Sequence, residues 1–245
     1  MIIYFDESYD NAHRDLLYGA LFIPSSSTLH HRISLIRAET GHVAEIKYNT
    51  CKNNSRLSIC RRVVDAFMED TAYFRCVVVD QHGFDYSRFG RSDEPLSLKQ
   101  AGAYKKFAEM LLNPHRSYLE NAVFLADHMS RCRGDLFLES LRACFNANAQ
   151  RPVFRHLEEV RSDREQYQCL QVCDLLLGCV LNNLKPAKKP AKTRSGTIFV
   201  NVLEHRISCS APGKASAVRR RATQPRSLTC GTGERNKKAQ AIRPS

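Results

Sequence analysis

Short apolar runs alternate with longer segments of helical periodicity along the first 184 residues. Residues 1–7 and 15–23 are strand-length runs separated by the polar stretch YDNAHR, which predicts an antiparallel hairpin. Further strands are expected at 43–48, 72–80 and 122–127, with a possible one at 152–157. Helices are expected at 26–39, from Leu57 to about residue 69, and at 97–112, 135–147 and 166–183. A hairpin-led group of three strands followed by alternating helices and strands predicts an α/β domain with a mixed central sheet.

The positive charge of the chain is concentrated at its C-terminal end. Residues 185–245 hold 15 Lys or Arg and 2 Glu, whereas the other 22 basic and 23 acidic residues leave residues 1–184 at about −1. The segment 185–245 is rich in Pro, Gly and Ser and has little periodicity, which is typical of disorder. We therefore expect a domain at 1–184 and a disordered basic tail at 185–245. Such a tail could hold a phosphate backbone, or it could be a solvated extension without function.

Hydropathy and cysteine usage favour a cytoplasmic protein. No apolar run approaches the roughly 20 residues that span a bilayer, and the N-terminus lacks a basic-then-apolar leader. The ten cysteines are scattered singly through apolar segments, which indicates buried free thiols rather than a disulfide framework. Cys169 and Cys173 have no second pair at zinc-ligand spacing, so a zinc site is not favoured.

Acidic residues stand where several of the predicted strands end. Asp6 and Glu7 close the first strand, and the strands at 72–80 and 122–127 end in Asp80 and Asp127. In open α/β sheets the strand ends face the crevice where ligands bind, so these acids can converge. A single strand-end Asp is more often a turn former or a helix cap, and Asp80 is the easiest to explain in that way.

The alternation of side chains along a strand chooses among neighbouring acids. Tyr4 and Asp6 share one face of the first strand and Glu7 points to the other, so Asp6 is the acid expected in the cluster. By the same rule Glu45 and Lys47 of the predicted strand 43–48 share a face. That arrangement would place an ammonium group beside the carboxylates, where it could hold a phosphate oxygen.

Asp174 lies within the apolar helix CLQVCDLLLGCVL. A buried ionised carboxylate is costly unless a partner or a cation accompanies it. Gln171, Asp174 and Gly178 follow one another at helical spacing and form a polar and small-residue stripe, and the glycine would allow a close backbone approach.

A divalent cation would explain why these acids are brought together. Carboxylates that share a cleft repel one another by roughly 4 kcal/mol per pair at about 4 Å. Oxygen ligands alone favour Mg²⁺ or Mn²⁺ over zinc. Two such ions can clamp the attacking and leaving oxygens of a phosphodiester.

The pieces IIYFDES, EIKY, FLAD and LQVCDLLLG, in this order, resemble the bacterial domain-of-unknown-function family numbered 3800 (DUF3800). The resemblance covers residues 1 to about 183, and the family is similar to the ribonuclease H-like superfamily. It implies a ribonuclease H-like mixed central sheet flanked by helices, a carboxylate cluster and metal-dependent cleavage of nucleic acid.

The resemblance also implies roles for particular residues. Asp6 would be the central metal ligand and Asp174 the acid on the last helix, with Glu45 and Asp127 completing the set. Asp80 competes with Asp127, because strand 72–80 is expected to lie directly beside the first strand, but Asp127 matches the family pattern better.

The sequence is therefore compatible with three functions. The leading hypothesis is a metal-dependent nuclease, in phage defence or a mobile element, in which Asp6 and a metal hold the attacking water and Lys47 steadies the phosphate. DNA and RNA remain open as substrates, and the oligomeric state is not indicated. The second is a non-catalytic binding or scaffold module with the same fold. A metal-free hydrolase that acts on sugars through a carboxylate pair is less favoured, because Asp174 on a buried helix and the nearby Lys47 suit cations and phosphates better.

Overall fold

The computed structural model describes residues 1–9, 15–51, 53–81, 84–129, 134–147, 152–184 and 207–210. All the elements named below belong to one compact unit, Met1–Lys214. The remainder, Ala215–Ser245, and most of the predicted tail 185–245 lie outside the described residues, as does most of the predicted turn at 9–14. The predicted boundary at residue 184 and the predicted disorder of the tail therefore stay predictions.

A mixed sheet of five strands, in the order β5-β4-β1-β2-β3, forms the centre of this unit, and a four-residue strand, β6, pairs parallel with β3. β1 is antiparallel to β2 and parallel to β4, β2 is antiparallel to β3, and β4 is parallel to β5. The strands are β1 (Ile2–Tyr9), β2 (Asp15–Ile23), β3 (Tyr73–Asp80), β4 (Ala122–Asp127), β5 (Phe154–Val160) and β6 (Ile207–Ser210).

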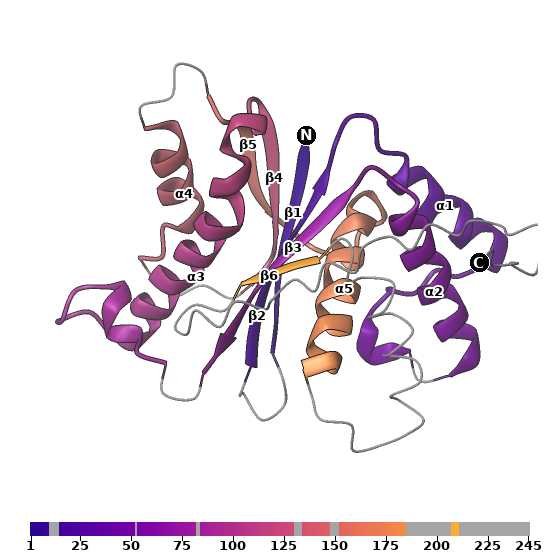
Figure 1. The fold of residues 1–245 in the computed structure, drawn as a ribbon, viewed down its shortest axis with the longest axis horizontal. Coiled ribbons are helices and arrows are strands. Elements are labelled where there is room, and N and C mark those ends of the chain that lie inside the picture. The colour runs from indigo at the N-terminus through magenta and orange to yellow at the C-terminus, as the bar shows by residue number, and fades with distance from the viewer. Residues whose placement is uncertain are drawn as a thin grey trace, which may run out of the picture. The chain divides into compact units, whose positions relative to one another are not determined.

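Helices cover both faces of the sheet, with α3 and α4 on one side and α1, α2 and α5 on the other (Figure 1). The α-helices are α1 (Leu29–Thr40), α2 (Asn54–Met68), α3 (Leu96–Leu112), α4 (Phe137–Asn146) and α5 (Gln168–Leu184). Short 3₁₀ helices are η1 (Tyr48–Thr50), η2 (Tyr86–Phe89), η3 (Asn113–Tyr118) and η4 (Glu165–Tyr167). The expected mixed α/β architecture is confirmed. None of the described helices has the length and apolarity needed to cross a membrane.

Strand alternation divides the core into two clusters. On β1, Ile3 and Phe5 pack with α3 and α4, whereas Tyr4 packs with α1, α2 and α5. α5 is almost wholly buried, as its apolar sequence predicts. It approaches the sheet closely at Gly19, where a Cβ would lie 2.9 Å from Leu177 of α5. A Cβ at residue 19 would also lie 2.8 Å from the Phe74 ring, so a larger residue there would force the side chains of Leu177 and Phe74 to shift.

Two expectations about the strands are wrong. Residues 43–48 form no strand but an irregular segment that leads into η1. Strand 72–80 does not lie beside the first strand, because β2 separates them and β4 is the direct parallel neighbour of β1. Local alternation of apolar residues does not contain the long-range information that decides either point.

Candidate carboxylate site

Asp6 lies near the end of β1, on the sheet face that α5 covers. Its side chain is only 6% exposed, and Tyr4, two residues earlier, belongs to the cluster around α5. Glu7 points to the opposite face, where its Oε2 accepts a hydrogen bond from the Tyr104 hydroxyl at 3.0 Å. The alternation rule therefore distinguishes the two acids correctly, and Asp6 is the one that faces the last helix.

Asp127 closes β4, the strand next to β1. Phe5 is in register with Ala126, so Asp6 and Asp127 are the next residues along two adjacent parallel strands. Asp80 lies elsewhere. Asp6 pairs with Gly19 of β2, and Gly19 pairs with Cys76 of β3. Asp80 is therefore four residues further along β3, on the far side of β2 from Asp6, and it is exposed.

Asp174 reaches the same region from α5. The close approach of α5 at Gly19 occurs at Leu177, one helical turn beyond Asp174, and Gly19 is the register partner of Asp6. On the preceding residue, the Cys173 thiol donates to the Tyr4 carbonyl at 3.7 Å, which fastens this turn of α5 to β1. Packing against a glycine thus brings the helix acid toward the strand acid.

The polar stripe of α5 holds the segment that carries Glu45 and Lys47. Gln171 Oε1 accepts from the Ile46 amide at 2.9 Å and from Arg37 Nη2 at 2.6 Å, and its Nε2 donates to the Ser162 carbonyl at 2.5 Å. Arg37 also donates to the carbonyls of residues 42 and 44, at 3.0 and 2.8 Å. Side-chain hydrogen bonds therefore position this segment, in place of a strand ladder.

Gly178, the last member of the stripe, gives Tyr48 room. A Cβ at residue 178 would lie 2.2 Å from the Cβ of Tyr48, a distance at which something must shift. The close approach predicted from the glycine is thus present, and it docks the start of η1 on α5.

Glu45 and Lys47 form an ion pair in this docked segment. The Lys47 Nζ lies 2.9 Å from Glu45 Oε1, and the Ser162 hydroxyl donates to the same oxygen at 2.8 Å. Both charged side chains are partly exposed, at 40% for Lys47 and 28% for Glu45. The structure therefore brings the two residues together, although not through the strand that the sequence predicted.

Electrostatic interactions connect all five predicted site residues. Burial, followed by the charges of Asp174, Glu7 and Asp127, raises the pKa of Asp6 well above its ordinary value. Burial also raises the pKa of Asp174, to about 6, and the charges of Glu45 and Asp127 add to this while Lys47 opposes it.

The remaining members of the group respond to the same field. Burial raises the pKa of Asp127, and Lys47 opposes that effect. Burial lowers the pKa of Lys47, but its hydrogen bond to Glu45 and the charges of Glu45, Asp174 and Asp127 outweigh this and raise it overall. The group is thus a set of acids with one ammonium group at its edge.

The donor set has the chemistry of a hard-cation site. Its acids offer only oxygen atoms, and the ordinary ligands of Mg²⁺ and Mn²⁺ are oxygens. In the part of the chain that the structure describes, no three His, Cys, Asp or Glu side chains are arranged so that they could already hold a metal ion. Glu45 is engaged instead with Lys47 and Ser162.

Sequence reasoning missed two residues that shape this group, Arg37 and Ser162. Arg37 is one of two arginines on α1, and Ser162 lies in a loop after β5, so neither has a distinctive local pattern. Arg37 acts through its hydrogen bond to Gln171 and Ser162 through its hydrogen bond to Glu45, and more than 100 residues separate the members of each pair in the sequence.

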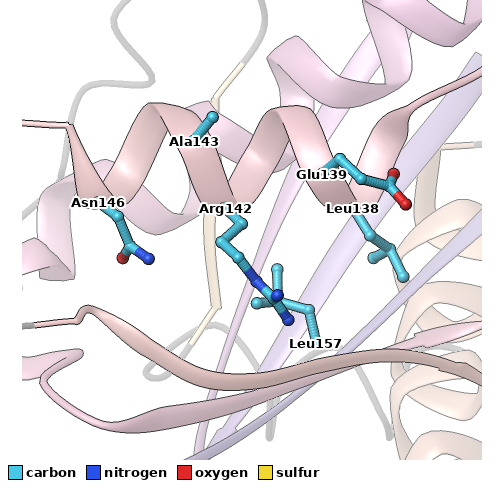
Figure 2. Close-up of a pocket in the computed structure, with 6 residues that line it drawn as sticks. All are labelled: Leu138, Glu139, Arg142, Ala143, Asn146 and Leu157. Carbon is cyan, nitrogen blue, oxygen red and sulfur yellow. The ribbon is translucent and has the colours of Figure 1, made fainter.

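A pocket of about 310 Å³ lies between α4 and β5, and none of the predicted site residues lines it. The Arg142 side chain extends from α4 toward Leu157 of β5, while the Glu139 side chain points away from Leu157 (Figure 2). The lining residues are Leu138, Glu139, Arg142, Ala143, Asn146 and Leu157.

No model of a protein family matches the chain, and no curated protein matches it.

Proposed function

We propose that this protein is a metal-dependent nuclease that hydrolyses phosphodiester bonds of nucleic acid. One observation carries the proposal: Asp6, Asp127 and Asp174 come from three different elements, burial raises the pKa of each, and the charges of Asp127 and Asp174 raise the pKa of Asp6 further. A protein that needed these positions only for packing would be more stable with apolar side chains there.

The electrostatics favour a cation as the missing partner. The largest charge effects on Asp6 all come from carboxylates, namely Asp174, Glu7 and Asp127. Lys47 offsets part of the charge on Asp127 and Asp174, but it is itself paired with Glu45. A bound Mg²⁺ or Mn²⁺ would remove the remaining repulsion and hold the acids in their ionised form.

In this proposal each residue has a separate task. Asp6, Asp127 and Asp174 would hold the metal ion, and Glu45, which is paired with Lys47 in the structure, would be the fourth ligand. Lys47 would hold a non-bridging oxygen of the scissile phosphate. The metal would polarise the phosphate and lower the pKa of the attacking water.

We further propose that the fold is ribonuclease H-like and that the chain is a relative of the DUF3800 family. The mixed central sheet with helices on both faces agrees with what that resemblance implies. The motif residues Gln171, Asp174 and Gly178 have distinct structural tasks on one face of α5, which supports treating that motif as a functional unit.

Binding of Mn²⁺ followed by cleavage assays tests the proposal. Calorimetric titration of the full chain should show saturable binding that Asp6→Asn abolishes. Asp80→Asn is the matched control, since Asp80 also ends a strand but lies apart from the group, and it should leave binding unchanged. Purified protein should then cleave single-stranded, duplex or hybrid nucleic acid with Mn²⁺ and not with EDTA.

The assays also separate the alternative, a non-catalytic binding module with the same fold. Retention of nucleic acid without cleavage, under conditions in which Mn²⁺ binds, would favour the module. Equal Mn²⁺ affinity of the wild type and Asp6→Asn would contradict a metal site at these carboxylates, both for the nuclease and for the binding module.

A further inference from the structure

β5 is an edge strand of the sheet. It pairs with β4 on one side, and among the residues that the structure describes no strand lies on its other side. The Val160 carbonyl accepts a hydrogen bond from the His128 amide at 2.9 Å, so Val160 directs its backbone groups at β4. Consecutive residues of a strand direct these groups to opposite sides, so those of Leu157, three residues earlier, point away from β4. An outward-facing amide and carbonyl form a template for another strand.

Basic residues precede Leu157 on this strand, and acidic residues follow it. Arg155 and His156 come before Leu157, and Glu158 and Glu159 come after it. His156 Nε2 lies 3.0 Å from Glu158 Oε2, so these two exposed side chains share one face of β5. Leu157 points to the other face, where it belongs to the core cluster that α3 and α4 cover. The strand therefore has opposite charges on the two sides of a central apolar residue.

These charges select one register for antiparallel pairing with a second copy of the strand. The two-fold axis must pass through a residue, because opposite residues of an antiparallel pair share a face of the sheet. With the axis at Leu157, His156 of each copy lies opposite Glu158 of the other. With the axis at a neighbouring polar residue, that residue would lie opposite itself, which is unfavourable. With the axis at either end of β5, most of the strand would lie opposite residues beyond the strand.

We propose that two copies of this chain associate through β5, antiparallel and about a two-fold axis at Leu157, so that one sheet runs through both. Leu157 of each copy exchanges both backbone hydrogen bonds with Leu157 of the other. His156 and the opposing Glu158 then form a non-hydrogen-bonded pair on each side of the axis, the type of pair in which side chains are closest. The interface uses none of the five residues of the candidate carboxylate site and is independent of the proposed nuclease activity.

The pocket between α4 and β5 adjoins this interface. Leu157 is one of its lining residues, together with Leu138 and Arg142 of α4, and the Arg142 side chain extends toward Leu157 (Figure 2). Because the two strands share their faces, Leu157 of the second copy lies on this same face, next to the pocket. Burial of the two leucines against each other adds an apolar contact to the backbone hydrogen bonds.

The features that commonly protect edge strands do not prevent this pairing. Charged side chains and bulges discourage contact between edges. Here the irregularity of the β4–β5 ladder lies before His156, which pairs with Val123, so residues 156–160 form a regular edge. The charges of that edge are complementary to those of its own copy in the antiparallel direction. They therefore favour self-association in one register instead of opposing it.

Complementary charge variants test the proposal. Light scattering of the full chain, purified free of nucleic acid, should give twice the monomer mass of 27.9 kDa. His156→Glu places two acids opposite each other, and Glu158→Lys removes the acid from each pair, so each variant should dimerise roughly tenfold or more weakly than wild type. An equal mixture of the two variants should regain the dimer mass. In that heterodimer, every pair across the axis again joins an acid with a basic side chain.

A matched control separates the interface from a general effect of charge. Asp65 is exposed on α2, on the opposite face of the sheet from α4, so Asp65→Lys makes the same change of charge elsewhere and should leave the dimer mass unchanged.

Hydrogen exchange of the wild-type chain provides a measurement that needs no variant. The Leu157 amide points outward, so its exchange should slow as the protein concentration rises and the dimer forms. The Val160 amide points at β4 and should be protected at every concentration.

Three results would overturn the proposal. The first is a wild-type chain that stays monomeric up to its solubility limit. The second is a dimer that neither His156→Glu nor Glu158→Lys weakens, which would place the contact on another surface. The third is a mixture of these two variants that stays monomeric, which would show that their charges do not face each other across the axis.

Discussion

At the scale of single residues, the buried acids of the candidate site lower the stability of the fold. Asp6 is buried beside Asp127 and Asp174 with acids as its strongest charged neighbours, so its ionised form works against the folded state. Residues of this kind are retained where a protein needs them for chemistry, and replacing them commonly makes the fold more stable.

We predict that Asp6→Asn stabilises the metal-free protein while abolishing Mn²⁺ binding. An amide has the shape of the acid without its charge, so the variant should gain about 1–2 kcal/mol in free energy of unfolding at pH 7.5. Urea denaturation in EDTA measures the gain, and Asp80→Asn, whose acid is exposed, should stay within about 0.5 kcal/mol of wild type. A clear loss of stability in Asp6→Asn would show that the acid is compensated in the folded state.

Asp174 allows a prediction about pH, because its pKa is raised from 3.8 to about 6. Below pH 3.8 the acid is protonated in both the folded and the unfolded chain and contributes nothing. As pH rises toward 6, the unfolded chain loses this proton first, so the wild type is progressively destabilised, and the effect is complete above about 6. A shift of about two units corresponds to at most about 3 kcal/mol.

The free-energy difference between Asp174→Asn and wild type should therefore grow from pH 4 to pH 7 and then level off. Denaturation curves of both proteins in EDTA at each pH measure it, and using the difference cancels groups that titrate in the opposite sense, such as Asp70. A constant difference across this range would contradict the raised pKa.

At the scale of elements, α5 organises the candidate site. Its Cys173 thiol contacts β1, its Gln171 amide holds the segment before η1, and its Gly178 receives Tyr48. The helix thereby fixes Glu45 and Lys47 in space although no sheet hydrogen bonds support them.

We predict that Gln171→Ala releases this segment. The substitution leaves the Ile46 amide, the Ser162 carbonyl and one Arg37 nitrogen without their present partner, which should cost about 2–4 kcal/mol. Hydrogen exchange should show loss of protection at the Ile46 amide. Gln168→Ala is the matched control: that buried glutamine bonds to α1 at Ser34 and the His30 carbonyl, so its loss should leave Ile46 protected.

The elements show how far the sequence could be interpreted. Strand 122–127 was predicted to the residue, and α2, α3 and α5 to within a few residues, since periodicity and caps such as Asn53 are local signals. The interpretation of 43–48 as a strand failed because that segment is held by Gln171 and Arg37, which lie in other elements. The order of the strands failed for the same reason, since pairing is decided across the whole chain.

At the scale of the whole molecule, the described core ends before the basic tail begins. The last residue of the two apolar clusters is Leu181, and the charge of residues 1–184 is about −1 against +12 for the whole chain. Apart from β6, which pairs with β3, the described elements and most of the positive charge therefore lie in different parts of the sequence.

We predict that a chain ending at residue 184, which lacks β6, keeps the five-strand sheet and its Mn²⁺ binding but loses salt-sensitive affinity for nucleic acid. Circular dichroism and calorimetry check the first part. Binding to a duplex at several salt concentrations checks the second, because fewer phosphate contacts give a smaller dependence of affinity on salt. An unchanged salt dependence would place the nucleic-acid contacts within residues 1–184.

The position of β1 has a consequence for how the chain folds while it is being synthesised on the ribosome. The strand that carries Asp6 lies in the middle of the sheet, and its parallel neighbour β4 and covering helix α5 are made more than 100 residues after it. The hairpin of β1 and β2 therefore has an unpaired β1 edge until β4 has been made, and the face that α5 covers stays incompletely covered until α5 leaves the exit tunnel. A nascent chain stalled before α5 therefore lacks Asp174, and the acids of the candidate site come together only after α5 has been made.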